Sequence, residues 1–233
     1  MRRIAIITAR GGSKRIPRKN IREFCGKPII GYSIEAAIKS GCFDEVMVST
    51  DDTEIAEIAK SFGASVPFLR SSRNSDDYST TADVIREVMT DYSELGKPFD
   101  IFCCIYPTAP FLTAKKLREA VELMDKTCCE TVVSVTRFSF PPQRAFVIRN
   151  ERIEYRYPEY ASARSQDLEA IYHDCGQFYL CRTEAFLREH SLITRDTVPF
   201  ILPESEVQDN DQMSDWIIAE AKFRALRSGD GKE

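Results

Sequence analysis

The sequence has 233 residues, of which 43% are hydrophobic and 29% charged, which is typical of a globular protein folded as one large α/β domain. Its formal net charge of −4 argues against general affinity for nucleic acid, because that affinity needs an excess of Lys and Arg. The sequence has no apolar run long enough to span a bilayer, so we expect no membrane insertion.

Short apolar strands alternate with helices along most of the chain. We expect strands over residues 4–8, 45–49, 99–106, 131–136 and 176–181, and helices over residues 28–39, 53–62, 80–95, 113–125, 183–190 and 214–226. Pro28 and Gly41 mark the limits of the first helix, because proline favours a helix start and glycine the position after its end. The alternation predicts an α/β fold with a mostly parallel sheet and helices on both faces.

The pattern breaks between residues 138 and 172. This stretch loses the helical period and is rich in Arg, Tyr and Pro, with candidate hairpin strands over residues 145–148 and 153–157. We interpret it as a small subdomain inserted into a single domain that spans residues 1–233.

The eight cysteines lack C-x-x-C spacing for zinc, and Cys103 and Cys104 lie inside an apolar run. Reduced, buried thiols are therefore expected. The N-terminus leads directly into a strand and contains no signal-peptide core. Both observations favour a cytoplasmic protein.

The N-terminal segment is basic although the chain is acidic overall. No acidic residue precedes Glu23, whereas eight cations do: Arg2, Arg3, Arg10, Lys14, Arg15, Arg18, Lys19 and Arg22. Most of them follow the first strand, where open α/β sheets bind ligands. Glycines at residues 11 and 12 would let the N–H groups of residues 11–13 form an anion nest, while Arg10, Lys14 and Lys19 neutralise a triphosphate.

The loop matches neither G-x-x-x-x-G-K-[ST], the phosphate-binding motif of many ATPases, nor G-x-G-x-x-G, the dinucleotide-binding motif of many dehydrogenases. The loop therefore does not support assignment to either class. The alternative to a triphosphate-binding loop is a patch of solvated surface cations. The glycines, the preceding strand and the following helix argue against that alternative.

The run from Ala9 to Ile21, followed by Gly26-Lys-Pro28, resembles the signature of CMP-sialic-acid synthetases and their relatives. The resemblance covers nearly the whole chain. Within that family, the segments at residues 138–146 and 172–179 are most similar to the branch that activates pseudaminic acid. The resemblance implies a mononucleotide-binding, Rossmann-like α/β fold, dependence on Mg²⁺, and a homodimer whose inserted subdomain reaches toward the partner's active site and its sugar.

The resemblance also assigns a nucleotide site, made of Arg10, Gly11, Gly12, Ser13, Lys19, Asn20 and Arg70. Arg10, Ser13 and Lys19 match triphosphate-binding positions, and Asn20 matches a position near the cytidine. Arg70 matches the base-recognising region, although Arg73 is an alternative there. Lys19, Asp211 and Arg10 are the residues expected to be catalytic.

The acidic sugar is expected to contact Arg164, Gln177 and Tyr179, which match sugar-contact positions, and Tyr106, which neighbours the sugar site. An arginine is a natural bidentate partner for a sugar carboxylate, and Arg144 is a further candidate. The sialic acid enzymes have glutamine where this chain has Tyr106 and arginine where it has Leu112. These departures argue against N-acetylneuraminate as the sugar and leave the nucleotide chemistry unchanged.

Asp209 and Asp211 flank a single residue before the last predicted helix, so their carboxylates could share a hard cation. Helix capping is the alternative for such a triplet. The resemblance favours Mg²⁺ at Asp209 and Asp211. For Asp51 and Asp52, a cap of the helix starting near Thr53 is the stronger interpretation.

The predicted reaction is attack by the anomeric hydroxyl of a nonulosonic acid on the α-phosphorus of CTP, giving a CMP-sugar and pyrophosphate. Pseudaminic acid is the expected sugar, with N-acetylneuraminic and legionaminic acids as alternatives. Two other classes are considered: a glycosyltransferase with a D-x-D metal site, and a non-catalytic RNA-binding module. The net charge argues against the latter.

Overall fold

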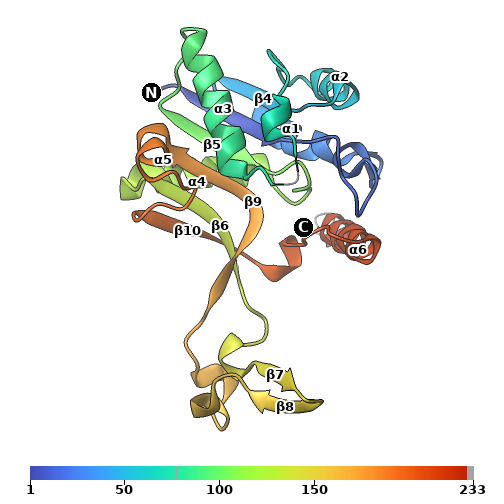
Figure 1. The fold of residues 1–233 in the computed structure, drawn as a ribbon, viewed down its shortest axis with the longest axis vertical. Helices are drawn as coiled ribbons and strands as arrows, with labels where there is room; N and C mark the ends of the chain where they lie inside the picture. Colours follow the sequence, from blue (N-terminus) through green and yellow to red (C-terminus); the bar gives the residue numbers. More distant parts are fainter. Residues whose placement is uncertain (77, 230–233) are drawn as a thin grey trace.

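The computed structural model describes residues 1–76 and 78–229. Its centre is a six-stranded sheet in the order β10-β6-β9-β5-β1-β4 (Figure 1). These strands are β1 (Arg3–Thr8), β4 (Glu45–Ser49), β5 (Ile101–Ile105), β6 (Thr131–Arg137), β9 (Tyr172–Arg182) and β10 (Thr197–Leu202). Only β9 within this sheet is antiparallel to its neighbours, β5 and β6. The predicted mostly parallel α/β sheet is confirmed.

Helices cover both faces of the sheet, as predicted (Figure 1). The helices are α1 (Ile29–Ser40), α2 (Thr53–Ser61), α3 (Thr81–Glu94), α4 (Ala114–Thr127), α5 (Thr183–Glu189) and α6 (Met213–Gly229). The first core cluster joins one face to α1, α2 and α4, and the second joins the other face to α3 and α5. Strand residues on alternating sides supply both clusters, because successive side chains point to opposite faces.

Local capping residues explain where several helices begin and end. Thr80 and Asp83 form a capping box at the start of α3, and Thr113 accepts the N–H of Lys116 at the start of α4. Gly41 follows α1 with a φ of 67°, a left-handed conformation that glycine adopts without strain. These short-range signals are readable from sequence.

Strand β10 was missed by the sequence pattern. Pro199 interrupts its apolar run, and a proline within a run argues against a central strand because it cannot donate to the ladder. The topology resolves the conflict, since β10 lies at the edge of the sheet and pairs with β6 alone. Proline is tolerated at edges.

The chain between β6 and β9 folds apart from the main sheet and forms the lower lobe in Figure 1. It contains the antiparallel hairpin of β7 (Phe146–Arg149) and β8 (Arg152–Tyr155). Asn150 and Glu151 have φ values of 49° and 61°, the signature of a two-residue turn that matches strand twist. The ends of the two strands differ from the predicted ranges by one or two residues.

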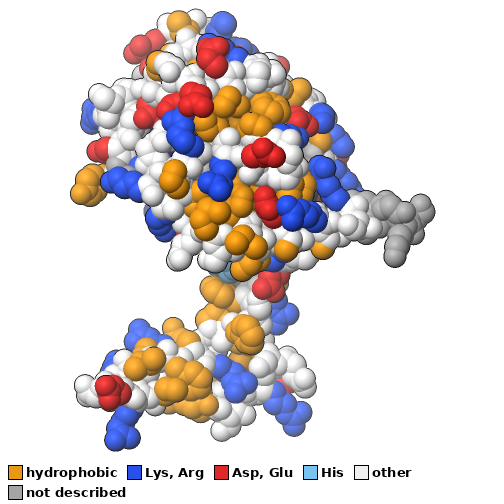
Figure 2. Space-filling view, turned by 90° about the vertical axis from the view of Figure 1, so that its right-hand side faces the viewer, with side chains coloured by type: hydrophobic (Ala, Val, Ile, Leu, Met, Phe, Trp, Pro, Cys, Tyr) orange, Lys and Arg blue, Asp and Glu red, His pale blue; other side chains and the backbone are white. Residues whose placement is uncertain are grey.

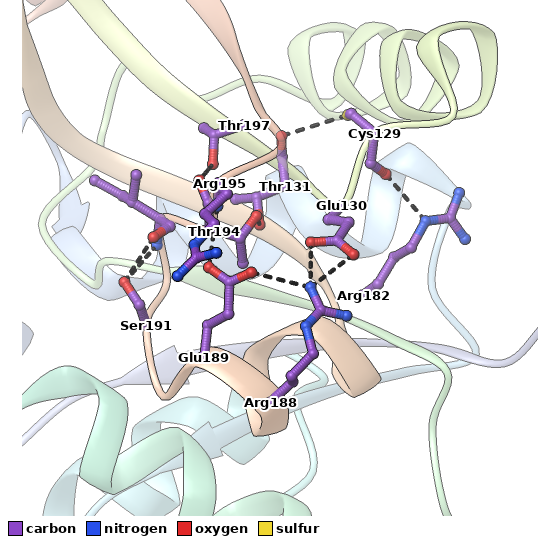
Figure 3. Close-up of polar contacts among 11 residues, drawn as sticks. Cys129, Glu130, Thr131, Arg182, Arg188, Glu189, Ser191, Thr194, Arg195 and Thr197 are labelled. Atoms are coloured by element: carbon purple, nitrogen blue, oxygen red, sulfur yellow. Dashed lines mark hydrogen bonds and ion pairs between the residues drawn. The ribbon is translucent and has the colours of Figure 1, made fainter.

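The amino ends of β6 and β10 are joined by an ion-pair cluster (Figure 3). The Arg188 guanidinium donates to both oxygens of Glu130, at 2.7 and 2.6 Å, and to Glu189 at 3.0 Å. Glu189 also accepts the backbone N–H of Arg195 at 3.0 Å. These contacts belong to the end of the sheet opposite the carboxyl ends of β1 and β5.

The remaining regular segments are short: β2 (Glu23–Phe24), β3 (Lys27–Pro28) and six 3-10 turns, at Lys19–Ile21, Ser72–Asn74, Pro142–Arg144, Pro158–Tyr160, Ser165–Asp167 and Glu204–Glu206. Over residues 1–76 and 78–229, the structure has no helix whose length and apolar character would let it cross a bilayer.

Candidate active site

A polar cleft of about 540 Å³ lies at the carboxyl ends of β1 and β5. Open α/β sheets place their ligand sites at this edge. The cleft is lined by three chain segments: Thr8, Arg10, Ser13, Lys14, Arg15, Lys19 and Asn20; Arg70, Asn74, Asp76, Ser79, Thr81 and Val84; and Tyr106, Pro107 and Thr108. The expected residues Arg10, Ser13, Lys19, Asn20, Arg70 and Tyr106 therefore share one cavity.

Lys19 joins the basic loop to the chain before α6. Its Nζ donates to the carbonyl of Asn210 at 2.9 Å and lies 4.0 Å from a carboxylate oxygen of Asp211. Burial lowers the pKa of Lys19, and the charges of Asp211 and Asp209 oppose that shift. Both carboxylates thus lie close enough to act on this ammonium group.

The glycine loop does not form the expected anion nest in this structure. The N–H of Gly11 donates to Asp51 Oδ1 at 2.9 Å, and the N–H of Ser13 donates to the Gly11 carbonyl at 3.0 Å. Two of the three N–H groups therefore already donate hydrogen bonds to acceptors within the protein. The positive charge of the cleft comes instead from side chains that line it, among them Arg10, Lys14 and Lys19.

Asn20 and Arg70 are buried polar residues with defined partners. Asn20 Nδ2 donates to the carbonyl of Arg10 at 2.8 Å, which fixes the loop where it enters the cleft. Arg70 is 8% exposed and donates from Nε to Ser49 Oγ at 3.0 Å and from Nη2 to the Ser49 carbonyl at 2.5 Å. Burial lowers the pKa of Arg70, with Asp51 opposing. Of the two candidate arginines, Arg70 lines the cleft and Arg73 does not.

An aromatic cluster brings the acidic pair to the loop from the far end of the chain. On α6, Trp216 and Phe223 pack edge to face against Phe24, with ring centroids 5.5 and 5.3 Å away. Arg15 then reaches Asp211 in a bidentate ion pair with two N–O distances of 2.8 Å. Residues 196 positions apart are joined in this way.

Asp209 and Asp211 supply the donor chemistry that a hydrated Mg²⁺ would need. Both are carboxylates, the hard ligands that Mg²⁺ prefers, and the intervening Asn210 is buried with an Oδ1 that has no partner within the described chain. Residues 1–76 and 78–229 contain no group of three or more His, Cys, Asp or Glu arranged for a metal. Two carboxylates with water and phosphate oxygens would suit Mg²⁺, which retains much of its hydration.

The four expected sugar contacts are not brought together in one chain. Tyr106 lines the cleft, and the Tyr179 ring lies beside it with centroids 5.9 Å apart. Gln177 is 3% exposed and donates to the Glu206 carbonyl at 2.7 Å, so it is not part of the cleft wall. Arg164 and Arg144 belong to the lobe between β6 and β9, from which no described residue lines the cleft.

Comparison with known proteins gives the family. The profile of the family described as cytidylyltransferase matches residues 4–196. The chain belongs to the cytidylyltransferase family.

Relatives match nearly the whole chain. It is 40% identical over 225 residues to a pseudaminic acid cytidylyltransferase of Campylobacter jejuni, covering 96% of this chain and 97% of that one. It is 35% identical to a CMP-N,N'-diacetyllegionaminic acid synthase of Legionella pneumophila, with 94% and 95% coverage. Its fold matches a CMP:2-keto-3-deoxy-manno-octonic acid synthetase complexed with CTP, at a TM-score of 0.69, 18% identity, and coverage of 99% and 100%.

A cytidylyltransferase must hold a triphosphate, and the cations of the cleft suit that task. The sequence pattern indicates Arg10, Lys14, Lys19 and Arg70 for this cleft but gives Arg15 no role. It gives no sign of Asn74, an uncharged residue that also lines the cleft. The bidentate contact of Arg15 with Asp211 could not be inferred from spacing. The cap predicted for Asp52 is confirmed, since its carboxylate accepts the Ile55 N–H at 3.0 Å at the start of α2.

Proposed function

We propose that this protein transfers CMP from CTP to the anomeric hydroxyl of pseudaminic acid, giving CMP-pseudaminic acid and pyrophosphate. The observation that carries the proposal is the cleft itself, in which a cationic loop shares one cavity with the buried Arg70 and with Tyr106. The 40% identity to a pseudaminic acid cytidylyltransferase supports this choice of sugar.

In the proposed reaction the sugar oxygen attacks the α-phosphorus and the bond to the β-phosphate oxygen breaks, so pyrophosphate leaves with that electron pair. Such a transfer depends on positioning and on neutralising charge. Arg10 and Lys19 would offset the charge of the phosphates, and Arg70 would face the base. Asp209 and Asp211 would hold Mg²⁺, which when bound supplies further phosphate neutralisation and lowers the pKa of the attacking hydroxyl.

A panel of sugars tests the substrate. Pseudaminic, legionaminic, N-acetylneuraminic and ketodeoxyoctonic acids would each be incubated with CTP and Mg²⁺, and released pyrophosphate measured. We expect the highest kcat/KM with pseudaminic acid. A higher value with another acid would contradict the sugar assignment, and hydrolysis of a nucleotide-sugar without use of CTP would favour the glycosyltransferase alternative.

Replacing Asp211 by alanine tests the metal site. We expect Asp211→Ala to abolish pyrophosphate release, because removing one of two carboxylates leaves too little charge to hold the cation. Circular dichroism and thermal unfolding should show a folded protein. Normal turnover by the folded variant would overturn the metal assignment.

We also propose a homodimer in which the lobe of residues 138–172 reaches the partner's cleft. Hydrophobic side chains gather on this lobe (Figure 2), where Phe140, Phe146, Ile148 and Ile153 are all exposed. Exposed apolar patches of this kind mark interaction sites. In a dimer, Arg164 of one chain would meet the sugar carboxylate in the other chain's cleft.

A cytoplasmic location is proposed as well. All eight cysteines are free, and burial raises the pKa of the thiols of Cys103, Cys104 and Cys181, which keeps them protonated. Free thiols are typical of a reducing compartment. Cell fractionation followed by immunoblotting would test this location.

A further inference from the structure

The proposed mechanism does not use Asp174, which is hydrogen-bonded to Tyr179, the neighbour of the cleft residue Tyr106. Asp174 is an exposed residue near the start of β9, and its carboxylate has two partners within the same strand. Oδ1 accepts a hydrogen bond from the backbone N–H of Gly176 at 2.8 Å, and Oδ2 accepts one from the hydroxyl of Tyr179.

The contact between Asp174 and Tyr179 requires an irregular strand. Side chains five residues apart on a regular strand point to opposite faces of the sheet. The pairing of β6 with β9 shifts register between Val133 and Val135, and Gly176 has a left-handed φ of 61°. This break turns Asp174 to the face that carries Tyr179. Such bulges often re-aim side chains beside active sites.

The same break connects Tyr179 to the cleft wall. The ring of Tyr179 is 6% exposed and lies against Tyr106 at an interplanar angle of 58°. A Cβ on Gly176 would approach the Tyr106 ring at 3.4 Å, so the strand also packs closely against Tyr106. The Tyr106 hydroxyl lies 3.3 Å from Thr81 Oγ1, and both residues line the cleft. A continuous path therefore runs from a surface carboxylate to the cavity.

The chemistry of this path is directional. A carboxylate only accepts hydrogen bonds, so the Tyr179 hydroxyl must donate to Asp174. Burial and the bond to Asp174 raise the pKa of Tyr179, and burial raises the pKa of Tyr106, so both phenols remain protonated. The hydroxyl and ring of Tyr179 are thereby held in one orientation against Tyr106.

We infer that Asp174 is a positioning residue that acts through Tyr179 to hold Tyr106 at the sugar end of the cleft. It sets the affinity for the acidic sugar and leaves CTP binding unchanged. The inference rests on the proposed function in one respect, the placement of the sugar beside Tyr106.

The experiment measures KM for the sugar and for CTP separately, together with the CTP dissociation constant by calorimetry. We expect Asp174→Ala to raise the sugar KM about tenfold, the typical effect of losing a hydrogen bond to a charged group. The CTP constants should stay unchanged. Asp174→Asn retains one acceptor oxygen and should fall between wild type and the alanine variant.

The matched control is Asp196→Asn, which removes an exposed carboxylate at the opposite end of the sheet, just before β10. It should leave every constant unchanged. A parallel rise in both KM values for Asp174→Ala would indicate a general structural effect and overturn the inference, as would an unchanged sugar KM.

A double-mutant cycle tests the path through Tyr179. If Asp174 acts only through that hydroxyl, Asp174→Ala combined with Tyr179→Phe should give the same sugar KM as the larger of the two single changes. If the increases in sugar KM of the two single variants multiply in the double variant, Asp174 does not act through Tyr179 and the inference is overturned. A wild-type enzyme that releases no pyrophosphate with any sugar would overturn the proposed function and this inference with it. Normal turnover by the wild type, together with an unchanged sugar KM in Asp174→Ala, would overturn the inference alone.

Discussion

Gly11 and Gly12 are adjacent in the basic loop, but their surroundings differ. A Cβ on Gly11 would lie 2.6 Å from Asp52 Oδ2, whereas a Cβ on Gly12 would meet nothing within 4 Å. Asp52 cannot move aside easily, because it is held by Arg18 and by the N–H of Ile55. Of these two glycines, only Gly11 lies where a side chain would clash with its neighbours.

Gly11→Ala is therefore expected to lower the free energy of unfolding by about 1–3 kcal/mol, the usual cost of overpacking. Gly12→Ala is the matched control and should change it by less than about 0.5 kcal/mol. Urea unfolding followed by circular dichroism measures both. Equal losses in the two variants would contradict the packing described for Gly11.

At the proposed metal site, Arg15 and a divalent cation would compete for the same carboxylate. The guanidinium engages both oxygens of Asp211, so a cation bound there must displace it. We expect Arg15→Gln to bind Mn²⁺ more tightly than wild type without CTP, by about threefold to tenfold, since a partly exposed ion pair contributes about 1 kcal/mol. Electron paramagnetic resonance of free Mn²⁺ measures the affinity.

Arg22→Gln is the control for this prediction, because Arg22 does not line the cleft and packs over Trp216. Its Mn²⁺ affinity should equal that of wild type. An unchanged affinity in Arg15→Gln would show that the ion pair does not hinder the cation.

At the scale of the element, the start of α2 depends on one carboxylate. Asp52 caps the helix and pairs with Arg18 at 2.5 Å. The hydrogen bond from Arg18 is the main cause that lowers the pKa of Asp52 from 3.8 to about 2. Because this pKa lies below its unfolded value, the stabilisation is present above pH 4 and is lost as the pH falls from about 4 to 2.

Asp52→Asn should lower the free energy of unfolding at pH 7 by about 1–2 kcal/mol, a value reduced for the partial exposure of Arg18. Asparagine still caps helices, so the variant isolates the charge. The stability gap between wild type and variant should close between pH 4 and 2, as measured by urea titrations. A gap that stays constant with pH would contradict the role of the ion pair.

At the scale of the whole molecule, the hairpin lobe is the surface proposed to join two chains. Ile148 and Ile153 are directly paired across the hairpin and are 76% and 67% exposed. Replacing both by Asp should convert the proposed dimer to a monomer in sedimentation equilibrium, because burying charges at an apolar contact carries a large desolvation cost.

Sugar turnover should fall with dimer dissociation if Arg164 completes the partner's cleft, while CTP binding persists. Ile217→Asp places one such charge on the exposed face of α6, where the side chain is 64% exposed, and should leave the proposed dimer intact. A monomeric wild-type protein would contradict the proposed assembly.

The sequence by itself determined the architecture and most of the cleft's cationic wall. Strand and helix periods, caps such as Thr80 and the glycine after α1 depend on neighbouring residues, so they can be read along the chain. The loop after β1 is likewise a local feature. Its position at the edge of the sheet where ligands bind follows from the rule for parallel sheets.

Tertiary structure alone decided the contacts between distant segments. Pro199 belongs to a strand only because β10 lies at an edge. The Gly11 N–H is turned to Asp51, Arg15 meets Asp211 through the packing of α6, and Asp174 meets Tyr179 through a break in β9. No local pattern encodes such contacts, because they depend on how separate elements pack and where their register shifts.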